Sequence, residues 1–159
     1  MAFRFVNVDL EIRARRKLDA LAAAMGDRIM VLYCGPIGDR KYLLSVESEH
    51  LTHWGDPDQT LRRLCSVVEQ IPPIERAIWD KAKKVFDIGY EIVGTSKPLK
   101  RTSGGFSLRS ETLRRATDLG AELAVTMYVS GENEESTAFG LETDRRSRSN
   151  IARRKEFLE

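Results

Sequence analysis

Residues that commonly carry catalysis or bind metal ions are scarce in this sequence of 159 residues, which has two cysteines and two histidines. Cys34 and Cys65 each lie within an apolar run, which is typical of buried thiols in a reducing compartment, although two cysteines can also form one disulfide. A catalytic cysteine needs a nearby base and a lowered pKa, and neither cysteine is placed for this in the sequence. The Gly-x-Ser-x-Gly elbow of many hydrolases is also absent. We therefore expect a protein that is not an enzyme and that has no cofactor.

Long hydrophobic runs are missing as well. No run approaches the ~18 apolar residues that a membrane-spanning helix needs. Residues 1–8 lack the apolar core and the small-residue cleavage site of a secretory signal. By elimination, the sequence predicts a cytoplasmic protein with no membrane partner.

The net charge is small, +2, but it is unevenly distributed. Residues 1–144 hold 20 basic and 22 acidic residues, whereas residues 145–159 hold six basic and two acidic ones. The length and composition are those of one globular domain. We therefore predict a single, nearly neutral domain over residues 1–131 and a charged tail over residues 132–159, either a short helix or an extended arm.

Hydrophobic periodicity predicts alternating strands and helices. Strands are expected over residues 4–13, 28–34, 41–47, 85–93 and 121–129. Helices are expected over residues 16–25, from Pro57 to the break at Pro72 and Pro73, over residues 73–84, and from Ser110 to the cap at Gly120. The strand over residues 28–34 is continuously apolar, which predicts a central strand covered on both faces.

Two parts of the chain resemble each other: each has a strand, a helix, a glycine cap and an alternating strand, with the caps at Gly26 and Gly120. Two unrelated β-α-β units would share the same outline, so the repeat is a hypothesis. It predicts an α+β fold with a mostly antiparallel or mixed sheet and helices on one face. The expected layout is ferredoxin-like or split β-α-β, built from two related β-α-β units.

Three segments carry a family resemblance: Phe86–Gly89, the helix start Ser110–Leu113, and Ala124–Tyr128. Over residues 5–130 the chain resembles a family of small, uncharacterised bacterial proteins. Their layout is similar to that of immunity-type proteins of bacterial conflict systems. The resemblance implies binding of a partner protein and supplies no catalytic residues. The nearly neutral body does not favour a basic nuclease as that partner.

Two candidate sites involve side chains that can bind metal ions or move protons. His50 and His53 lie among carboxylates and can bind a divalent metal ion, but their spacing on an irregular loop fixes no ligand geometry, so a solvated loop is the preferred interpretation. Asp9 and Asp87 take equivalent places in the two similar units, and paired carboxylates can perform acid/base chemistry. Because both alternate with apolar residues, we expect them to point to solvent or to cap a loop.

Two basic segments are candidate binding sites for phosphate or for a partner. A loop before the last helix can cradle a phosphate, or it is a simple linker. Its residues are Lys100, Arg101, Ser103, Gly104 and Gly105. The tail can contact nucleic acid or an acidic partner, but it has one aromatic residue for base stacking, Phe157. Its basic residues are Arg145, Arg146, Arg148, Arg153, Arg154 and Lys155.

The sequence thus leaves three functions open. The leading hypothesis is a non-enzymatic protein-binding module, with an immunity-type protein as its specific form. The second is a small-ligand protein or enzyme with a site between the sheet and the loops at residues 47–56 and 95–107. The third is nucleic-acid binding through the tail. An exposed edge strand also makes a homodimer feasible.

Overall fold

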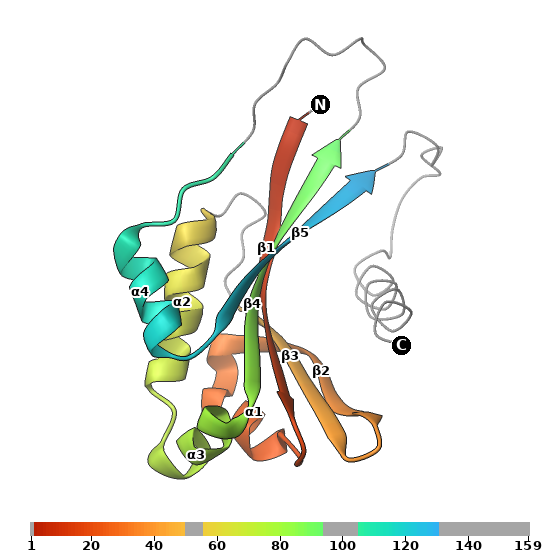
Figure 1. Ribbon diagram of the computed structural model, residues 1–159, viewed down its shortest axis with the longest axis vertical. Coiled ribbons are helices and arrows are strands. Elements are labelled where there is room, and N and C mark those ends of the chain that lie inside the picture. The colour runs from red at the N-terminus through yellow and green to blue at the C-terminus, as the bar shows by residue number, and fades with distance from the viewer. Residues whose placement is uncertain (1, 50–55, 94–104, 131–159) are drawn as a thin grey trace.

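The computed structural model of the chain describes residues 2–49, 56–93 and 105–130, which form five strands and four α-helices (Figure 1). The strands are β1 (Ala2–Ala14), β2 (Ile29–Gly38), β3 (Lys41–Ser48), β4 (Lys83–Val93) and β5 (Glu122–Ser130). The helices are α1 (Asp19–Met25), α2 (Pro57–Glu69), α3 (Pro73–Lys81) and α4 (Ser110–Asp118), and a single 3-10 turn (Gly26–Arg28) precedes β2. Their order along the chain agrees with the predicted order of elements.

The strands form one mixed sheet in the order β2-β3-β1-β4-β5. Strands β2, β3, β1 and β4 are antiparallel to their neighbours, and β5 joins β4 in parallel. Strands β1 and β2 therefore run in the same direction with β3 between them, which is a split β-α-β arrangement. The predicted α+β class is confirmed, while the ferredoxin-like layout and the internal repeat remain predictions.

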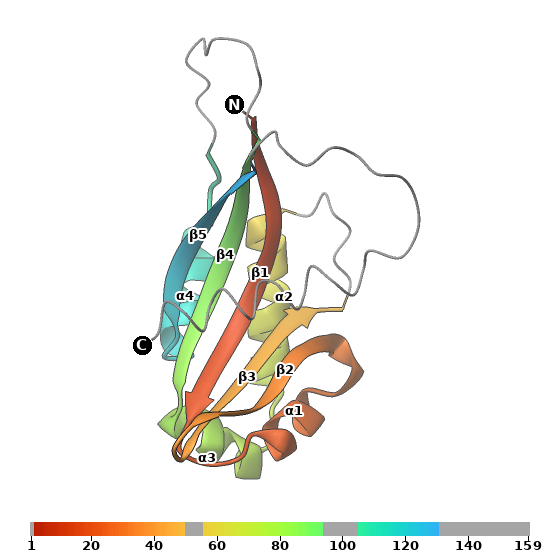
Figure 2. The ribbon, with the colours of Figure 1, turned by 90° about the vertical axis from the view of Figure 1, so that its right-hand side faces the viewer.

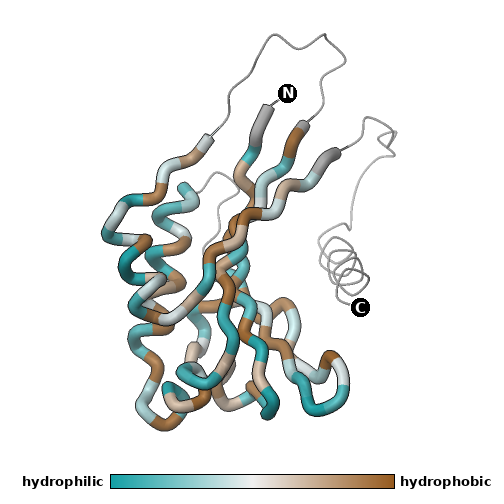
Figure 3. The backbone as a smooth tube through the Cα atoms, in the orientation of Figure 1, coloured by the Kyte–Doolittle hydropathy of each residue, from teal (hydrophilic) through white to brown (hydrophobic). Residues whose placement is uncertain are grey.

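All four helices lie on one side of the sheet (Figures 1 and 2). The alternation of hydrophobic and polar residues in β1 explains this packing, because successive side chains of a strand point to opposite faces. Val8, Leu10 and Ile12 are buried against the helices, together with Phe86 and Ile88 of β4. Figure 3 shows the same alternation of hydrophobic and hydrophilic positions along the tube.

Helix α2 begins as the sequence predicts. The side chain of Asp56 accepts a hydrogen bond from the backbone N–H of Asp58 (3.0 Å), and Pro57 occupies the first turn. Leu61, Leu64, Cys65 and Val68 are buried in the core. The burial of Cys65 confirms the expectation for this thiol.

Strand β2 contradicts the prediction of a central strand, because it lies at one edge of the sheet. Met30 and Val31 are about half exposed, and Cys34 is exposed and not buried as expected. The apolar residues of β2 belong to a hairpin in which this strand pairs with β3. Helix α1 covers only the start of the strand, at Ile29. A run of apolar residues alone does not distinguish these two positions.

Helical spacing also predicts that Ile74 of α3 and Leu113 of α4 face inward, and for these two residues the prediction is wrong. Ile74 in the first turn of α3 is 80% exposed, and Leu113 of α4 is 38% exposed. In α4 the expected inward residues Ala116 and Leu119 are buried, and Thr112 is buried in place of Leu113.

Trp79 of α3 is the largest fully buried side chain. Its indole Nε1 donates a hydrogen bond to the backbone oxygen of Leu119, at 3.0 Å. Lys84 lies over the Trp79 ring and donates a hydrogen bond to its backbone oxygen at 3.1 Å. These contacts connect the ends of α3 and α4 to the start of β4. Within the described residues no helix is long and apolar enough to span a bilayer.

Candidate functional site

A row of carboxylates crosses the face of the sheet opposite the helices. In the strand register, Asp9 of β1 is directly opposite Glu47 of β3 on one side and Asp87 of β4 on the other. Residues that are paired in this way project from the same face. Glu11 lies two positions along β1, so it shares that face. We call Asp9, Glu11, Glu47 and Asp87 the carboxylate row.

Hydrogen bonds from neighbouring side chains hold the row in place. The amide Nδ2 of Asn7 donates to Asp9 Oδ1 (2.8 Å) and also to Glu47 Oε1, so it bridges β1 and β3. On the other side, the hydroxyl of Thr126 lies 2.8 and 3.0 Å from the two oxygens of Asp87 and connects β5 to β4. The row therefore lies on three strands, β3, β1 and β4, and Thr126 links it to a fourth, β5.

Asp9, Glu11 and Asp87 are buried, while Glu47 is half-buried. Like charges on directly opposite strand positions repel each other, and burial of a carboxylate is costly without a donor or a cation. Arg13 supplies one cation, with its Nη2 at 2.9 Å from Glu11 Oε2. Asp9, Glu11 and Asp87 each have a further interaction partner in the structure. The row thus favours positively charged groups as its contacts.

A bulge in β1 and a glycine in β4 allow the Asn7 side chain to reach the carboxylate row. The register of β1 against β4 shifts between Phe5 and Asn7, which is a bulge that places Asn7 opposite Gly89. A Cβ atom at Gly89 would lie 2.4 Å from Asn7 Oδ1. Glycine at this position therefore allows the Asn7 amide to lie across β4 and reach Asp9.

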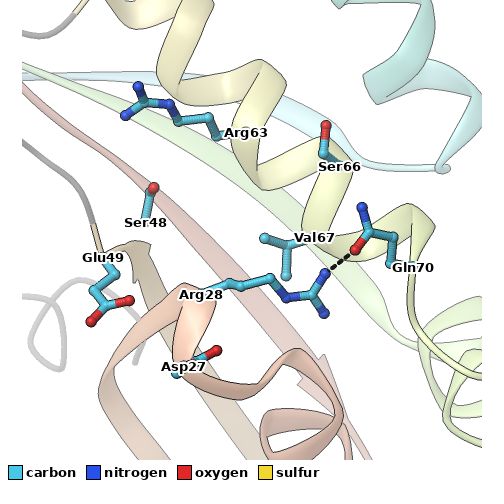
Figure 4. A pocket seen from close by; sticks show the side chains of 8 residues that line it. All are labelled: Asp27, Arg28, Ser48, Glu49, Arg63, Ser66, Val67 and Gln70. Carbon is cyan, nitrogen blue, oxygen red and sulfur yellow. Dashed lines mark hydrogen bonds between the residues drawn. The ribbon is translucent and has the colours of Figure 1, made fainter.

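A second candidate is an open hollow of about 400 Å³ between the β2–β3 sheet end and α2. Its lining residues are Asp27, Arg28, Ser48, Glu49, Arg63, Ser66, Val67 and Gln70. Figure 4 shows Arg28 reaching across the hollow to Gln70, to which it donates a hydrogen bond. The two arginines are balanced by two carboxylates, Asp27 and Glu49. The hollow thus has no excess charge with which to select an ionic ligand.

The structure brings together Asp9 and Asp87, which the sequence singled out as a pair. They are register partners on one face, but they are buried, so the expectation that they point to solvent or cap a loop is wrong. The sequence missed Asn7, Glu47 and Thr126. Period-two alternation does assign Asp9 and Glu11 to one face, but the strand register that adds the other residues is not visible in the sequence.

The other predicted site residues lie mostly outside the described part of the chain. This applies to the proposed metal ligands His50 and His53, to all six basic residues of the tail, and to part of the basic loop, namely Lys100, Arg101, Ser103 and Gly104. Gly105 is described and exposed, and a Cβ atom there would contact nothing within 4 Å. In the described ranges, no group of three or more His, Cys, Asp or Glu residues is arranged to hold a metal ion.

Neither cysteine has the properties of a nucleophile. Burial raises the pKa of the Cys65 thiol to about 11. The pKa of Cys34 is also raised, by partial burial and by the charge of Asp19. Thiolate is the reactive form, so both residues are weak nucleophiles at neutral pH.

Comparison with protein-family models, curated proteins and solved structures found no match for this chain. The resemblance to immunity-type proteins therefore remains a prediction.

Proposed function

We propose that this domain is a non-enzymatic protein-binding module whose recognition surface is the sheet face opposite the helices, at the half-buried Glu47 end of the carboxylate row. Its partner would present lysine or arginine side chains to the face of the sheet opposite the helices. The observation that carries the proposal is the alignment of Glu47, Asp9 and Asp87 in one row across three neighbouring strands. An immunity-type protein that neutralises a partner is the specific form of this function that the resemblance suggests.

Binding fits the row better than catalysis because its carboxylates are fixed by cross-strand hydrogen bonds from Asn7 and Thr126. Such an array offers charge in a constant geometry, which suits recognition of a cationic surface. A general acid and a general base instead need environments that separate their pKa values. The two cysteines, with raised pKa values, add no nucleophile.

The distribution of charge also supports a basic partner, in contrast to the expectation from net charge. The body of the chain is nearly neutral because basic residues elsewhere offset the carboxylates. On the sheet face, four carboxylates gather on three neighbouring strands, and Arg13 pairs with Glu11 there at 2.9 Å. Complementary potential over a small patch steers association and gives specificity even when the whole molecule is close to neutral.

A peptide titration tests the proposal. The full chain is titrated with a synthetic arginine-rich peptide over a series of salt concentrations, with binding followed by calorimetry. We expect binding that weakens with salt, and about tenfold weaker binding in Asp87→Asn and Glu47→Gln, which corresponds to about 1.4 kcal/mol each. The matched control is Glu111→Gln on α4, an exposed carboxylate on the helical side, and it should bind like the wild type.

Equal binding by the row variants and the control would refute the proposal, as would binding that does not respond to salt. The same titration with a single-stranded RNA probe tests the nucleic-acid alternative. Carboxylates repel phosphates, so RNA binding unaffected by the row variants would favour the tail as the functional element.

A further inference from the structure

The outer strand β5 differs from the rest of the sheet in how its side chains are covered. Leu123, Val125 and Met127 lie in register with the buried residues Phe86, Ile88 and Tyr90 of β4. Their exposed fractions nevertheless rise along the strand, from 39% to 51% and 62%. Figure 1 shows the reason: α4 lies beside the start of β5, and the strand then runs away from the helices. The result is an apolar stripe on an edge strand.

Strand β5 is also an edge strand of the sheet that the described residues form. One side of the strand bonds to β4, and no other described strand pairs with its outer side. Long, apolar edge strands tend to pair with another strand, and proteins normally block them with lysine, proline or bulges. The nine residues of β5, Glu122–Ser130, contain no Lys, Arg, Pro or Gly, and the only charge is at Glu122.

The opposite edge of the same sheet provides a comparison. Strand β2 carries Pro36 and has two register irregularities, between Val31 and Tyr33 and between Pro36 and Gly38. Both features obstruct the addition of another strand. The two edge strands thus differ. Strand β2 has a proline and register irregularities that obstruct pairing with another strand, and β5 has no proline and no such irregularity.

We propose that β5 pairs antiparallel with β5 of a second copy of this chain. A register centred on Thr126, the middle residue of the strand, sets Val125 of one copy opposite Met127 of the other. The exposed apolar stripe of each copy then packs against the same stripe across the twofold axis. The two Glu122 residues lie at opposite ends of the interface, roughly 27 Å apart at about 3.4 Å per residue, so their charges do not repel.

The self-complementary pattern of β5 favours a second copy over an unrelated strand. Its side chains are uncharged around the centre, and an isologous contact of this kind closes at two subunits. The dimer has one continuous ten-stranded sheet with all helices on one side. The two carboxylate rows then lie on the face opposite the helices, with Asp87 on the strand next to the new contact. The dimer does not depend on the proposed binding function, because it forms through the backbone and the apolar stripe of β5.

Mass measurements on the full chain by light scattering or ultracentrifugation test this proposal. The wild type should have twice the chain mass of 18.1 kDa. Met127→Lys and Val125→Lys should each shift it to the monomer mass, because a lysine at the centre of the stripe brings two like charges together. Met30→Lys on β2, at a residue that is 48% exposed, is the matched control and should remain dimeric. Circular dichroism checks that each variant is folded.

A monomeric wild type, a dimer that survives both β5 variants, or assembly beyond two copies would each overturn the proposal. Hydrogen exchange in the full chain tests whether a second copy or a segment of the same chain covers the outer edge of β5. Protection of the β5 amides that grows with protein concentration and is lost in Met127→Lys supports the dimer. Protection that is independent of concentration means that a segment of the same chain covers β5, which contradicts it.

Discussion

At Gly89 the side-chain amide of Asn7 lies over the backbone of β4, at the place where a Cβ atom would be. The distance of 2.4 Å between such an atom and Asn7 Oδ1 is too short for any real contact. Asn7 is the residue that bridges Asp9 and Glu47. A single hydrogen atom in place of a side chain on β4 therefore maintains the geometry of the carboxylate row.

We expect Gly89→Ala to lower the free energy of unfolding by about 1–3 kcal/mol, the range typical of overpacking. The shift of Asn7 would also release its hydrogen bonds to the row. Denaturant unfolding measures the loss, and Gly105→Ala, where a Cβ atom contacts nothing, should change stability little. In an Asn7→Ala background the substitution at Gly89 should cost less, because the clash is removed. The same loss in both backgrounds would contradict this explanation.

At the scale of elements, α2 and α4 are joined by polar contacts at both ends of their interface. Asp58 in the first turn of α2 accepts a hydrogen bond from the backbone N–H of Arg109 at 2.8 Å. Arg115 of α4 donates to both carboxylate oxygens of Glu69, at 2.8 and 2.7 Å, and to the hydroxyl of Ser66. These contacts hold α4 against α2, where the helix has few buried apolar residues of its own.

The contact at Asp58 predicts a loss of stability in acid. Burial by itself raises the pKa of Asp58, but the backbone N–H and the guanidinium of Arg109 outweigh burial and lower it. A carboxyl with a lowered pKa in the folded state stabilises the fold above its ordinary pKa of about 4, and this stabilisation is lost as the pH falls through the lowered value. Asp58→Asn cannot ionise, so it should lack this part of the pH dependence.

Urea unfolding at neutral and acidic pH measures this effect. Asp58→Asn should be about 1–3 kcal/mol less stable than the wild type at neutral pH, and the difference should shrink below pH ~3. Asp118→Asn, an exposed position at the end of α4, is the control. A difference between wild type and Asp58→Asn that stays constant with pH would show that the charge of Asp58 is not involved.

Helix α3 is fixed mainly through Trp79. Its indole hydrogen bond to the backbone oxygen of Leu119 connects α3 to the end of α4. Trp79→Phe removes the donor and leaves a cavity, so we expect a loss of about 2–4 kcal/mol in the free energy of unfolding. Ile74→Ala in the same helix, at the exposed position, should have an effect near zero. A large effect at Ile74 would mean that this residue is buried in solution.

At the scale of the whole molecule, the sequence predicted the order of elements well, because each element has a local signal. The alternation in residues 4–13, the Asp56–Pro57 start of α2 and the breaks at Pro72 and Gly120 are all local. Strand order is not a local property. The apolar run of β2 therefore suggested a central strand, whereas β1, with an alternating pattern, takes the centre of the sheet.

The candidate site could be predicted only in part for the same reason. Asp9 and Asp87 were recognisable as residues in similar local surroundings, but their contact depends on the antiparallel pairing of β1 with β4. Glu47 and Thr126 join them through two other strand pairs. Whole-chain net charge likewise concealed the row, since it averages over faces that the fold separates.

The central position of β1 has a consequence for how the chain folds as it is synthesised. Strand β1 precedes both of its neighbours in this domain: it pairs with β3 on one side, and its partner on the other side, β4, is completed only at Val93. Until then one side of β1 has open hydrogen-bonding groups, and Val8, Leu10 and Ile12 have only part of their final cover. Such non-local pairing slows folding and exposes intermediates to aggregation. Completion of β4 thus gives β1 its second neighbour, and α4, which follows, adds Ala116 and Leu119 to the core.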